Sequence, residues 1–218
     1  MRNKQFAVLG LGRFGSSLAR ELYQGNADVL AVDANSDLVD DIQGSVTHAV
    51  QADVTDISAL RELGIQDFDV AIVTIGEDLR SSSIVTMLLK ELGVPMVLAK
   101  AQDEMHGRML EKLGADRIIF VERDMGKRVA HSLLSGNILD YIQLSDDFAI
   151  VETVPHAAWI GKTFLDLNLR RKFGINVIAI RSDGEIRVSF APETVIHADD
   201  RLLVIGEQSA IKKLERSK

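Results

Sequence analysis

A glycine-rich hexapeptide near the start of the chain constrains its fold more than any other feature. Its sequence is Gly10-Leu11-Gly12-Arg13-Phe14-Gly15. It follows an apolar strand at residues 6–9 and precedes a segment whose apolar residues recur at helical spacing, which is the setting of a dinucleotide-binding fingerprint. The first glycine permits a tight turn, the second lets a phosphate approach the backbone, and the third lets helix and strand pack closely. The unpaired N–H groups at the helix start then attract an anion.

The residues that follow alternate between short apolar runs and longer amphipathic stretches. We expect strands at residues 6–9, 29–33, 49–52, 70–75, 96–99 and 118–121, with helices between them. Near-continuous apolar strands separated by helices indicate a parallel sheet that is buried on both faces. The sequence therefore predicts an α/β fold with a Rossmann-like, doubly wound sheet.

The second half of the chain has a different pattern. Residues 125–144 form one amphipathic stretch, interrupted at Gly136-Asn137, which we expect to be a crossover helix. Its apolar side indicates a subunit-swapping crossover, although packing on its own domain would also account for it. The remaining predicted elements are strands at 149–154, 176–180 and 202–205, helices at 163–171 and 209–214, and a hairpin turn at 182–185. We therefore expect a nucleotide-binding domain at 1–135, a linker at 136–146 and a smaller α/β ligand-binding domain at 147–218.

The composition excludes several classes of protein. The chain has 25 Lys and Arg against 32 Asp and Glu, a net charge of −7, and no separate basic tract, so we expect no nucleic-acid partner. It has no Cys, which excludes disulfides, thiolate metal sites and iron–sulfur clusters and suits a reducing cytoplasm. We find no export signal and no uncharged run of the ~18 residues that a membrane span needs. We expect a cytoplasmic protein that reaches a membrane only through a partner.

Further residues complete a candidate nucleotide site. Asp33 ends the second predicted strand, where a carboxylate accepts hydrogen bonds from ribose hydroxyls. Arg13 lies beside the phosphates and suits ADP or ATP as well as a dinucleotide, unless it is simply solvated. Asp53, Val54 and Thr55 follow the third strand at the expected edge for adenine, although Thr55 also suits a helix cap.

We expect no catalytic residue. The five His residues have no metal-ligand spacing, and no proton-transfer group is evident beside the fingerprint. A serine run at 81–83 has no nucleophile-elbow motif around it and is explained by helix capping. An NAD(P)-dependent oxidoreductase and an NADH-sensing regulator remain the alternatives to a non-catalytic nucleotide sensor. Glu122 opens a mixed-charge block and suits either a solvated helix start or a divalent cation near the phosphates.

Several segments in combination resemble one family. They are the opening Lys4-Gln5-Phe6-Ala7-Val8-Leu9 with the glycine motif, the strand end Val32-Asp33-Ala34-Asn35, the turn Gly114-Ala115-Asp116, and the block Glu122-Arg123-Asp124-Met125-Gly126. Together they resemble the RCK domains that regulate potassium conductance, in particular the cytosolic regulatory subunits of Ktr/Trk-type potassium uptake systems. The resemblance extends over the whole chain.

This resemblance implies a gating subunit that binds ATP or ADP, with NAD(H) as a further candidate, and does not turn it over. It implies dimers that assemble into an octameric ring on the cytosolic face of a membrane-embedded, potassium-translocating partner. By the same resemblance, Asn35 and Lys100 lie near the ribose and phosphates, and Glu122 helps to place Mg²⁺ or Ca²⁺ near the γ-phosphate.

The resemblance also extends to the C-terminal domain, which in several family members binds cyclic di-AMP. The corresponding stretch contains five candidate ligand contacts, Arg170, Asn176, Val177, Ala191 and Pro192. A plain packing role explains Val177 and Pro192 equally well, so cyclic di-AMP stays open as a second ligand.

Overall fold

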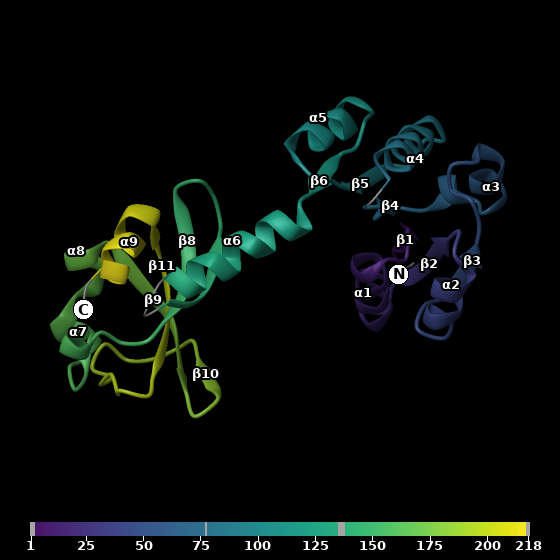
Figure 1. Cartoon of the computed structure of the whole chain (residues 1–218). Coiled ribbons are helices and arrows are strands. Elements are labelled where there is room, and N and C mark those ends of the chain that lie inside the picture. The colour runs from purple at the N-terminus through teal and green to yellow at the C-terminus, as the bar shows by residue number, and fades with distance from the viewer. Residues whose placement is uncertain (1–2, 77, 135–137, 217–218) are drawn as a thin grey trace. The chain divides into compact units, whose positions relative to one another are not determined.

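The structure, a computed structural model, describes residues 3–76, 78–134 and 138–216 (Figure 1). The chain divides into two compact units, Met1–Glu122 and Arg123–Lys218. Each unit has its own sheet and its own hydrophobic core. The division falls earlier in the chain than the predicted domain end at residue 135.

The first unit is built on a six-stranded parallel sheet of order β3-β2-β1-β4-β5-β6. Its strands are β1 (Gln5–Leu9), β2 (Asp28–Asp33), β3 (His48–Gln51), β4 (Val70–Val73), β5 (Met96–Lys100) and β6 (Arg117–Ile119). The strand order reverses between β1 and β4, which is the switch point where ligands bind in doubly wound sheets. The predicted doubly wound fold is confirmed.

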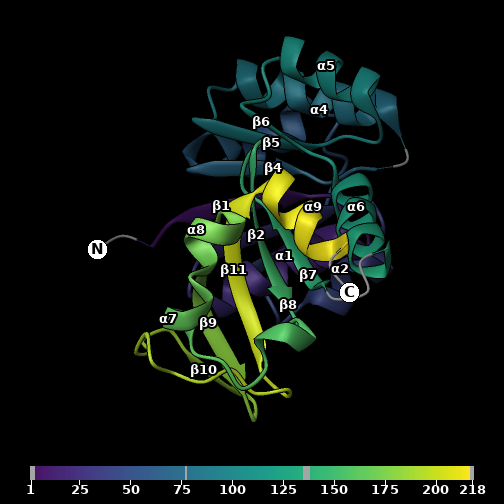
Figure 2. The ribbon, with the colours of Figure 1, turned by 90° about the vertical axis from the view of Figure 1, so that its left-hand side faces the viewer.

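Helices cover both faces of this sheet because successive side chains of a strand point to opposite sides. Val8 packs with Ala19 and Ile42 on one face, whereas Leu9 packs with Leu60 and Leu89 on the other. Figure 2 shows α4 and α5 on one side of the strands β4, β5 and β6. The helices are α1 (Arg13–Gln24), α2 (Ser36–Ile42), α3 (Ile57–Glu62), α4 (Leu79–Glu91) and α5 (Glu104–Lys112), with a 3₁₀ turn η1 (Ile65–Asp67).

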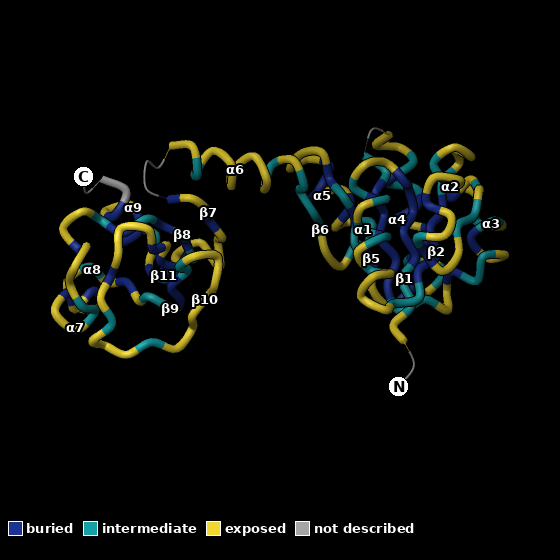
Figure 3. The backbone as a smooth tube through the Cα atoms, turned by 90° about the horizontal axis from the view of Figure 1, so that it is seen from below, coloured by how far each residue is buried: buried dark blue, intermediate teal, exposed yellow. Residues whose placement is uncertain are grey.

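The second unit contains a five-stranded antiparallel sheet of order β10-β9-β11-β8-β7. Its strands are β7 (Ile138–Gln143), β8 (Phe148–Thr153), β9 (Ile175–Ser182), β10 (Glu185–Arg187) and β11 (Arg201–Glu207). The other elements are α6 (Val121–Leu134), which begins in the first unit, η2 (Ala157–Trp159), α7 (Phe164–Leu167), α8 (Leu169–Phe173) and α9 (Gln208–Arg216). Trp159, Ile180 and Ile211 belong to one buried cluster between sheet and helices, and Figure 3 shows the buried strands in dark blue.

The expected crossover helix at 125–144 is wrong in its second half. The helix ends at Leu134, residues 135–137 lie outside the described part, and Ile138–Gln143 is the strand β7, paired with β8. A register shift between Ile138 and Asp140 brings Ile138 and Tyr141 onto the buried face at a spacing of three. That spacing imitates a helical repeat, which explains the error.

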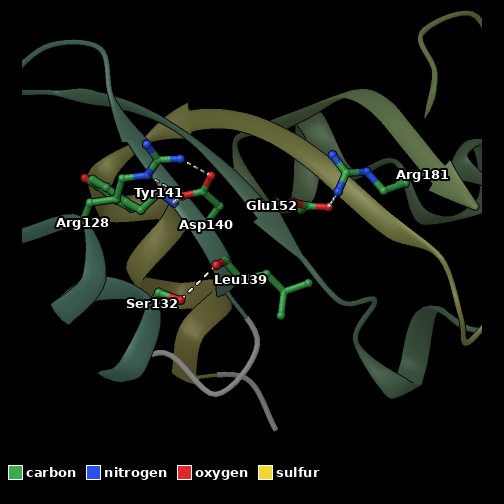
Figure 4. A network of polar contacts seen from close by, with 7 residues as sticks. All are labelled: Arg128, Ser132, Leu139, Asp140, Tyr141, Glu152 and Arg181. Atoms are coloured by element: carbon green, nitrogen blue, oxygen red, sulfur yellow. Dashed lines mark hydrogen bonds and ion pairs between the residues drawn. The ribbon is translucent and has the colours of Figure 1, made fainter. Parts of the chain in front are cut away.

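Polar contacts join α6 to β7 (Figure 4). The Arg128 guanidinium donates from Nε to Asp140 Oδ1 at 2.7 Å, and Ser132 Oγ donates to the Leu139 carbonyl at 2.9 Å. The His131 ring stacks on Tyr141 with centroids 4.3 Å apart. The first of these contacts holds the pKa of Asp140 below its ordinary value.

Two other expectations for this unit have different outcomes. The helix expected at 163–171 is two short helices, because Asn168 has a left-handed backbone (φ 43°) between them. The hairpin turn at 182–185 is confirmed, with Asp183 and Gly184 both at positive φ between β9 and β10.

Candidate nucleotide-binding site

The glycine loop connects β1 to α1 at the carboxyl edge of the sheet. Gly10 has a φ of 106°, which an L side chain rarely adopts. A Cβ at Gly15 would lie 1.9 Å from the Gly10 carbonyl oxygen, whereas a Cβ at Gly12 would meet nothing within 4 Å. The loop thus needs one glycine for the turn and one for close packing, and Gly12 leaves open space before the N-terminus of α1, as the fingerprint predicts.

Asp33 is fixed at the end of β2 by two backbone donors. Its Oδ2 accepts from the Leu11 N–H at 2.6 Å and its Oδ1 from the Asn35 N–H at 2.9 Å. These bonds tie the carboxylate to the glycine loop, beside the cavity that it lines. Asn35 does not line that cavity: its side chain accepts from the Asp37 N–H and caps α2.

A cavity of about 1130 Å³ opens at this edge of the sheet. Among the predicted residues it is lined by Gly10, Gly12, Arg13, Phe14, Asp33, Asp53, Val54, Thr55, Lys100 and Glu122. Two predicted residues lie behind its wall: Leu11 is buried at 1% exposure, and Gly15 packs against the Gly10 carbonyl. The volume suits a nucleotide-sized ligand.

One end of the cavity is formed by the turn after β3. The Asp53 carboxylate accepts from both the Thr55 backbone and the Thr55 hydroxyl, at 2.9 and 2.7 Å. The hydroxyl bond in particular holds the pKa of Asp53 below its ordinary value. Thr55 lines the cavity and orders the turn, and the cap of α3 is Asp56 rather than Thr55. Adenine binding at this turn stays a prediction.

The other end carries opposite charges. Lys100, from the end of β5, donates to Glu122 Oε1 at 2.6 Å, and Arg13 lines the same cavity from the start of α1. The bond from Lys100 is the main cause that lowers the pKa of Glu122, and the charge of Arg13 adds to it. Two cations beside a helix N-terminus make this the end of the cavity that suits phosphates.

Sequence analysis missed several lining residues, notably Thr74, Gly76, Asp78, Ser81 and Gln102. They follow β4 and β5, so the rule that ligands bind at the carboxyl ends of strands would have found them. Thr74 Oγ1 donates to the Gly10 carbonyl at 2.5 Å and braces the glycine loop. The N-cap of α4 is Asp78, not a serine of the 81–83 run, and the Ser81 hydroxyl donates to the carboxylate of that cap.

A closed metal site is not formed within the described residues. Among them, no group of three or more His, Asp or Glu side chains could hold a metal ion. Glu122 supplies one exposed carboxylate, already paired with Lys100. A cation held by Glu122 would therefore need further ligands, such as phosphate oxygens and water.

The candidate cyclic di-AMP residues lie in the second unit and do not line the cavity described above. Arg170 is exposed on α8, Asn176 and Val177 lie in β9, and Val177 packs against the second core. The Pro192 carbonyl accepts from the Leu165 N–H at 2.8 Å, which joins the loop at Ala191 and Pro192 to α7. These contacts account for packing, and cyclic di-AMP binding stays a prediction.

The chain matches two domain families over most of its length. The TrkA-N domain family matches residues 6–121, and the TrkA-C domain family matches residues 148–218. The chain is 45% identical to the Ktr system potassium uptake protein C of Bacillus subtilis and also 45% identical to protein A of the same system. The alignment with protein C covers 98% of this chain and 96% of the relative. The alignment with protein A covers 99% of this chain and 97% of the relative. This chain belongs to the TrkA family of potassium uptake proteins. The resemblance to RCK proteins is thereby confirmed.

A solved member of the same fold supports this placement. The structure of the GsuK channel bound to NAD aligns with this chain at a TM-score of 0.68 and 20% identity. The alignment covers 100% of this chain and 39% of the GsuK chain. At that identity the likeness shows the TrkA-family fold alone. Within the described residues, each helix is too short or too polar to cross a membrane.

Proposed function

We propose that this chain is a non-catalytic regulatory subunit of a potassium uptake system, in which an adenine nucleotide at the glycine-loop cavity sets the activity of a membrane-embedded partner. The observation that carries the proposal is the cavity itself. It combines a fingerprint glycine loop, the cations Arg13 and Lys100 and the Asp33 carboxylate, in a chain 45% identical to potassium uptake proteins. That identity extends over both domains.

The charges and the sheet order around the cavity support one direction for the proposed ligand. Phosphates lie at Gly12 and the N-terminus of α1, near Arg13 and Lys100, the ribose lies at Asp33, and adenine lies at the turn of Asp53 to Thr55. The γ-phosphate is the group that differs between ATP and ADP, so the charged end must distinguish them. A ligand shifts a conformational equilibrium only by its differential affinity for the two states.

Glu122 is the group through which Mg²⁺ or Ca²⁺ would act. A divalent cation carried by ATP phosphates needs few protein ligands, and one carboxylate is a common contribution. At Glu122 the cation would compete with the Lys100 ammonium, which occupies the carboxylate in this structure. Lys100 would then be released to contact phosphate.

The proposed assembly follows from the family. We place the protein in the cytoplasm, as dimers that form an octameric ring beneath the partner. Helix α6 has no buried residue in the single chain, and this supports self-association along it.

The oxidoreductase alternative is weaker. NAD is bound in the GsuK channel structure, which supports NAD(H) as a further ligand here. Hydride transfer, however, needs a proton-transfer group near the nicotinamide. The described residues that line the cavity include no His or Tyr, and its Lys100 and Glu122 side chains are paired with each other at the end that we assign to phosphates. The relatives that are potassium uptake proteins support a nucleotide that is sensed rather than turned over.

Thermal stability with ATP, ADP and NADH, each with and without Mg²⁺, tests the proposal. A ligand at 100 times its Kd stabilises the folded state by about 2.7 kcal/mol, which raises the melting temperature by several degrees. We expect shifts with ATP and ADP and a Mg²⁺-dependent difference between them. That difference disappears in Glu122→Gln.

Arg13→Ala serves as the binding variant, and Arg80→Ala as its control. Arg13 lines the cavity, whereas the exposed Arg80 does not. We expect weaker ATP and ADP shifts in the first and unchanged shifts in the second. A shift with NADH alone would instead favour the oxidoreductase or NADH-sensing alternative.

A further inference from the structure

His106 is a buried histidine directly behind the cavity wall. It lies in the first turn of α5, where its N–H donates to Asp103 Oδ1, the cap of that helix, at 2.8 Å. The residue is only 3% exposed and belongs to the buried face of α5 together with Gly107 and Leu110. It does not line the cavity.

The ring accepts a hydrogen bond from the loop between β5 and α5. The Gln102 backbone N–H donates to His106 Nδ1 at 3.3 Å. Nδ1 must therefore be unprotonated, and the neutral ring carries its proton on Nε2. Burial lowers the pKa of His106, partly opposed by the Asp103 carboxylate, and this keeps the imidazole neutral at pH 7.

That neutral ring leaves a polar atom without a partner. Among the described residues, no group accepts a hydrogen bond from the buried Nε2 of His106. An unpaired buried donor destabilises the fold, and an apolar side chain of similar shape would avoid the cost. Packing alone therefore does not explain a histidine here, whereas the acceptor atom Nδ1 does.

Gln102 links His106 to residues that line the cavity. Its side-chain amide donates to the Gly76 carbonyl, in the loop after β4, and Gln102, Gly76 and Lys100 all line the cavity. A chain of hydrogen bonds thus runs from His106 through Gln102 to Gly76. It joins the loops that follow β4 and β5, on either side of the charged end.

We propose that His106 is a positioning residue of the nucleotide site: its neutral imidazole fixes Gln102, and through Gln102 the wall formed by Gly76 and Lys100. This inference rests on the proposed function, because the wall matters for the phosphate end of a bound nucleotide. His106 itself does not touch the ligand.

Two substitutions at His106 distinguish the effect of the hydrogen-bond acceptor Nδ1 from the effect of the ring's packing. His106→Phe keeps an aromatic ring but removes the acceptor, and His106→Asn restores an acceptor oxygen near the position of Nδ1. We expect His106→Phe to weaken ATP binding about five- to tenfold in titration calorimetry, the size of one lost hydrogen bond. His106→Asn should return to within about threefold of the wild-type affinity.

Leu110→Val is the matched control. Leu110 is buried on the same face of α5, and no hydrogen bond joins it to Gln102 in the described structure. It should lower the melting temperature and leave the ATP affinity unchanged. Equal losses of affinity in Leu110→Val and His106→Phe, or no loss in His106→Phe, would overturn the inference.

Hydrogen exchange of the ligand-free protein gives a readout that does not depend on nucleotide. His106→Phe should speed exchange of the Gln102 amide, with little change in β1 and β2, and His106→Asn should slow it again. If the wild-type chain bound no nucleotide, the proposed function would fall, and the exchange data would still decide whether His106 fixes the loop. Unchanged exchange at Gln102 in His106→Phe would refute that role.

Discussion

Gly12 and Gly15 lie in the same loop, but different constraints act on them. Gly15 lies in α1 against the Gly10 carbonyl, so the protein's own backbone excludes a side chain there. Gly12 has an ordinary φ of −62° and open space around its Cβ position. The protein itself thus leaves room for a side chain at Gly12, and the phosphate of the proposed nucleotide, which the second glycine of the fingerprint lets approach the backbone, would exclude one.

The two alanine variants should therefore impair different properties, the stability of the fold in Gly15→Ala and the binding of ATP in Gly12→Ala. Gly15→Ala places a methyl group against backbone and should destabilise the fold by about 3 kcal/mol or more, measured by urea unfolding. Gly12→Ala should cost about 1 kcal/mol or less, because Gly12 is the N-cap of α1 and alanine is a poorer N-cap than glycine. The same Gly12→Ala should weaken ATP binding about tenfold or more, measured by calorimetry.

Each variant is the control for the other. A stable Gly12→Ala protein with wild-type ATP affinity would show that phosphate does not approach the loop at Gly12. A stable Gly15→Ala protein would contradict the close packing of α1 on β1.

At the scale of elements, the second unit depends on a backbone break that composition does not reveal. Asn168 separates α7 from α8 with a φ of 43°, and its N–H donates to the Phe164 carbonyl at 3.0 Å. Asn tolerates the left-handed region better than other residues that carry a Cβ, and Gly adopts it freely. The break allows Leu167 and Leu169, which flank it, both to be buried.

Asn168 therefore gives a test of this backbone break. Asn168→Ala should lower the stability of the second unit by about 1 kcal/mol, because alanine pays the full steric cost of the left-handed region. Asn168→Gly should change it by less than about 0.5 kcal/mol. Trp159, the one tryptophan of the sequence, is buried in that unit, so its fluorescence during urea unfolding measures both variants. Equal stability of the two variants would argue against a strained break.

The sequence predicted the first unit better than the second for a physical reason. Parallel strands buried on both faces are continuous apolar runs, and the helices that follow α1 in the first unit begin at side-chain caps such as Asn35 and Asp103. In β7 the register shift spaces the buried residues as in a helix. The segment that was expected to be one helix is divided into α7 and α8 by the positive φ of Asn168. Such local backbone choices are decided by tertiary packing and leave little periodic signal.

The same distinction applies to the site. Residues within the fingerprint, such as Gly10 and Asp33, were predictable because the motif fixes their geometry. Thr74 and Gln102 lie after β4 and β5, far away in the sequence, and only the sheet register brings them to the cavity. The Lys100–Glu122 ion pair was not predicted either, since each residue was assigned to the nucleotide or its cation.

At the scale of the whole molecule, α6 is the feature that a single chain leaves unexplained. Met125, Val129 and Leu133 recur at intervals of four residues along it and are 52%, 48% and 80% exposed. In Figure 3 the helix is largely coloured as exposed. The contacts of α6 with β7 are polar or aromatic and leave this apolar stripe exposed, and burial against another copy would remove the stripe from water.

Leu133→Glu should therefore reduce the oligomeric state of the protein. A carboxylate placed at the centre of an apolar contact must be desolvated without a partner, which costs several kcal/mol across a symmetric pair of subunits. Light scattering after size-exclusion chromatography at micromolar concentration measures the mass, and we expect a larger species in the wild type than in the variant. Val188→Glu is the matched control, because Val188 is 73% exposed and lies outside α6. A wild-type protein that elutes as a monomer, or an equal effect of both substitutions, would rule out α6 as the contact through which the subunits associate.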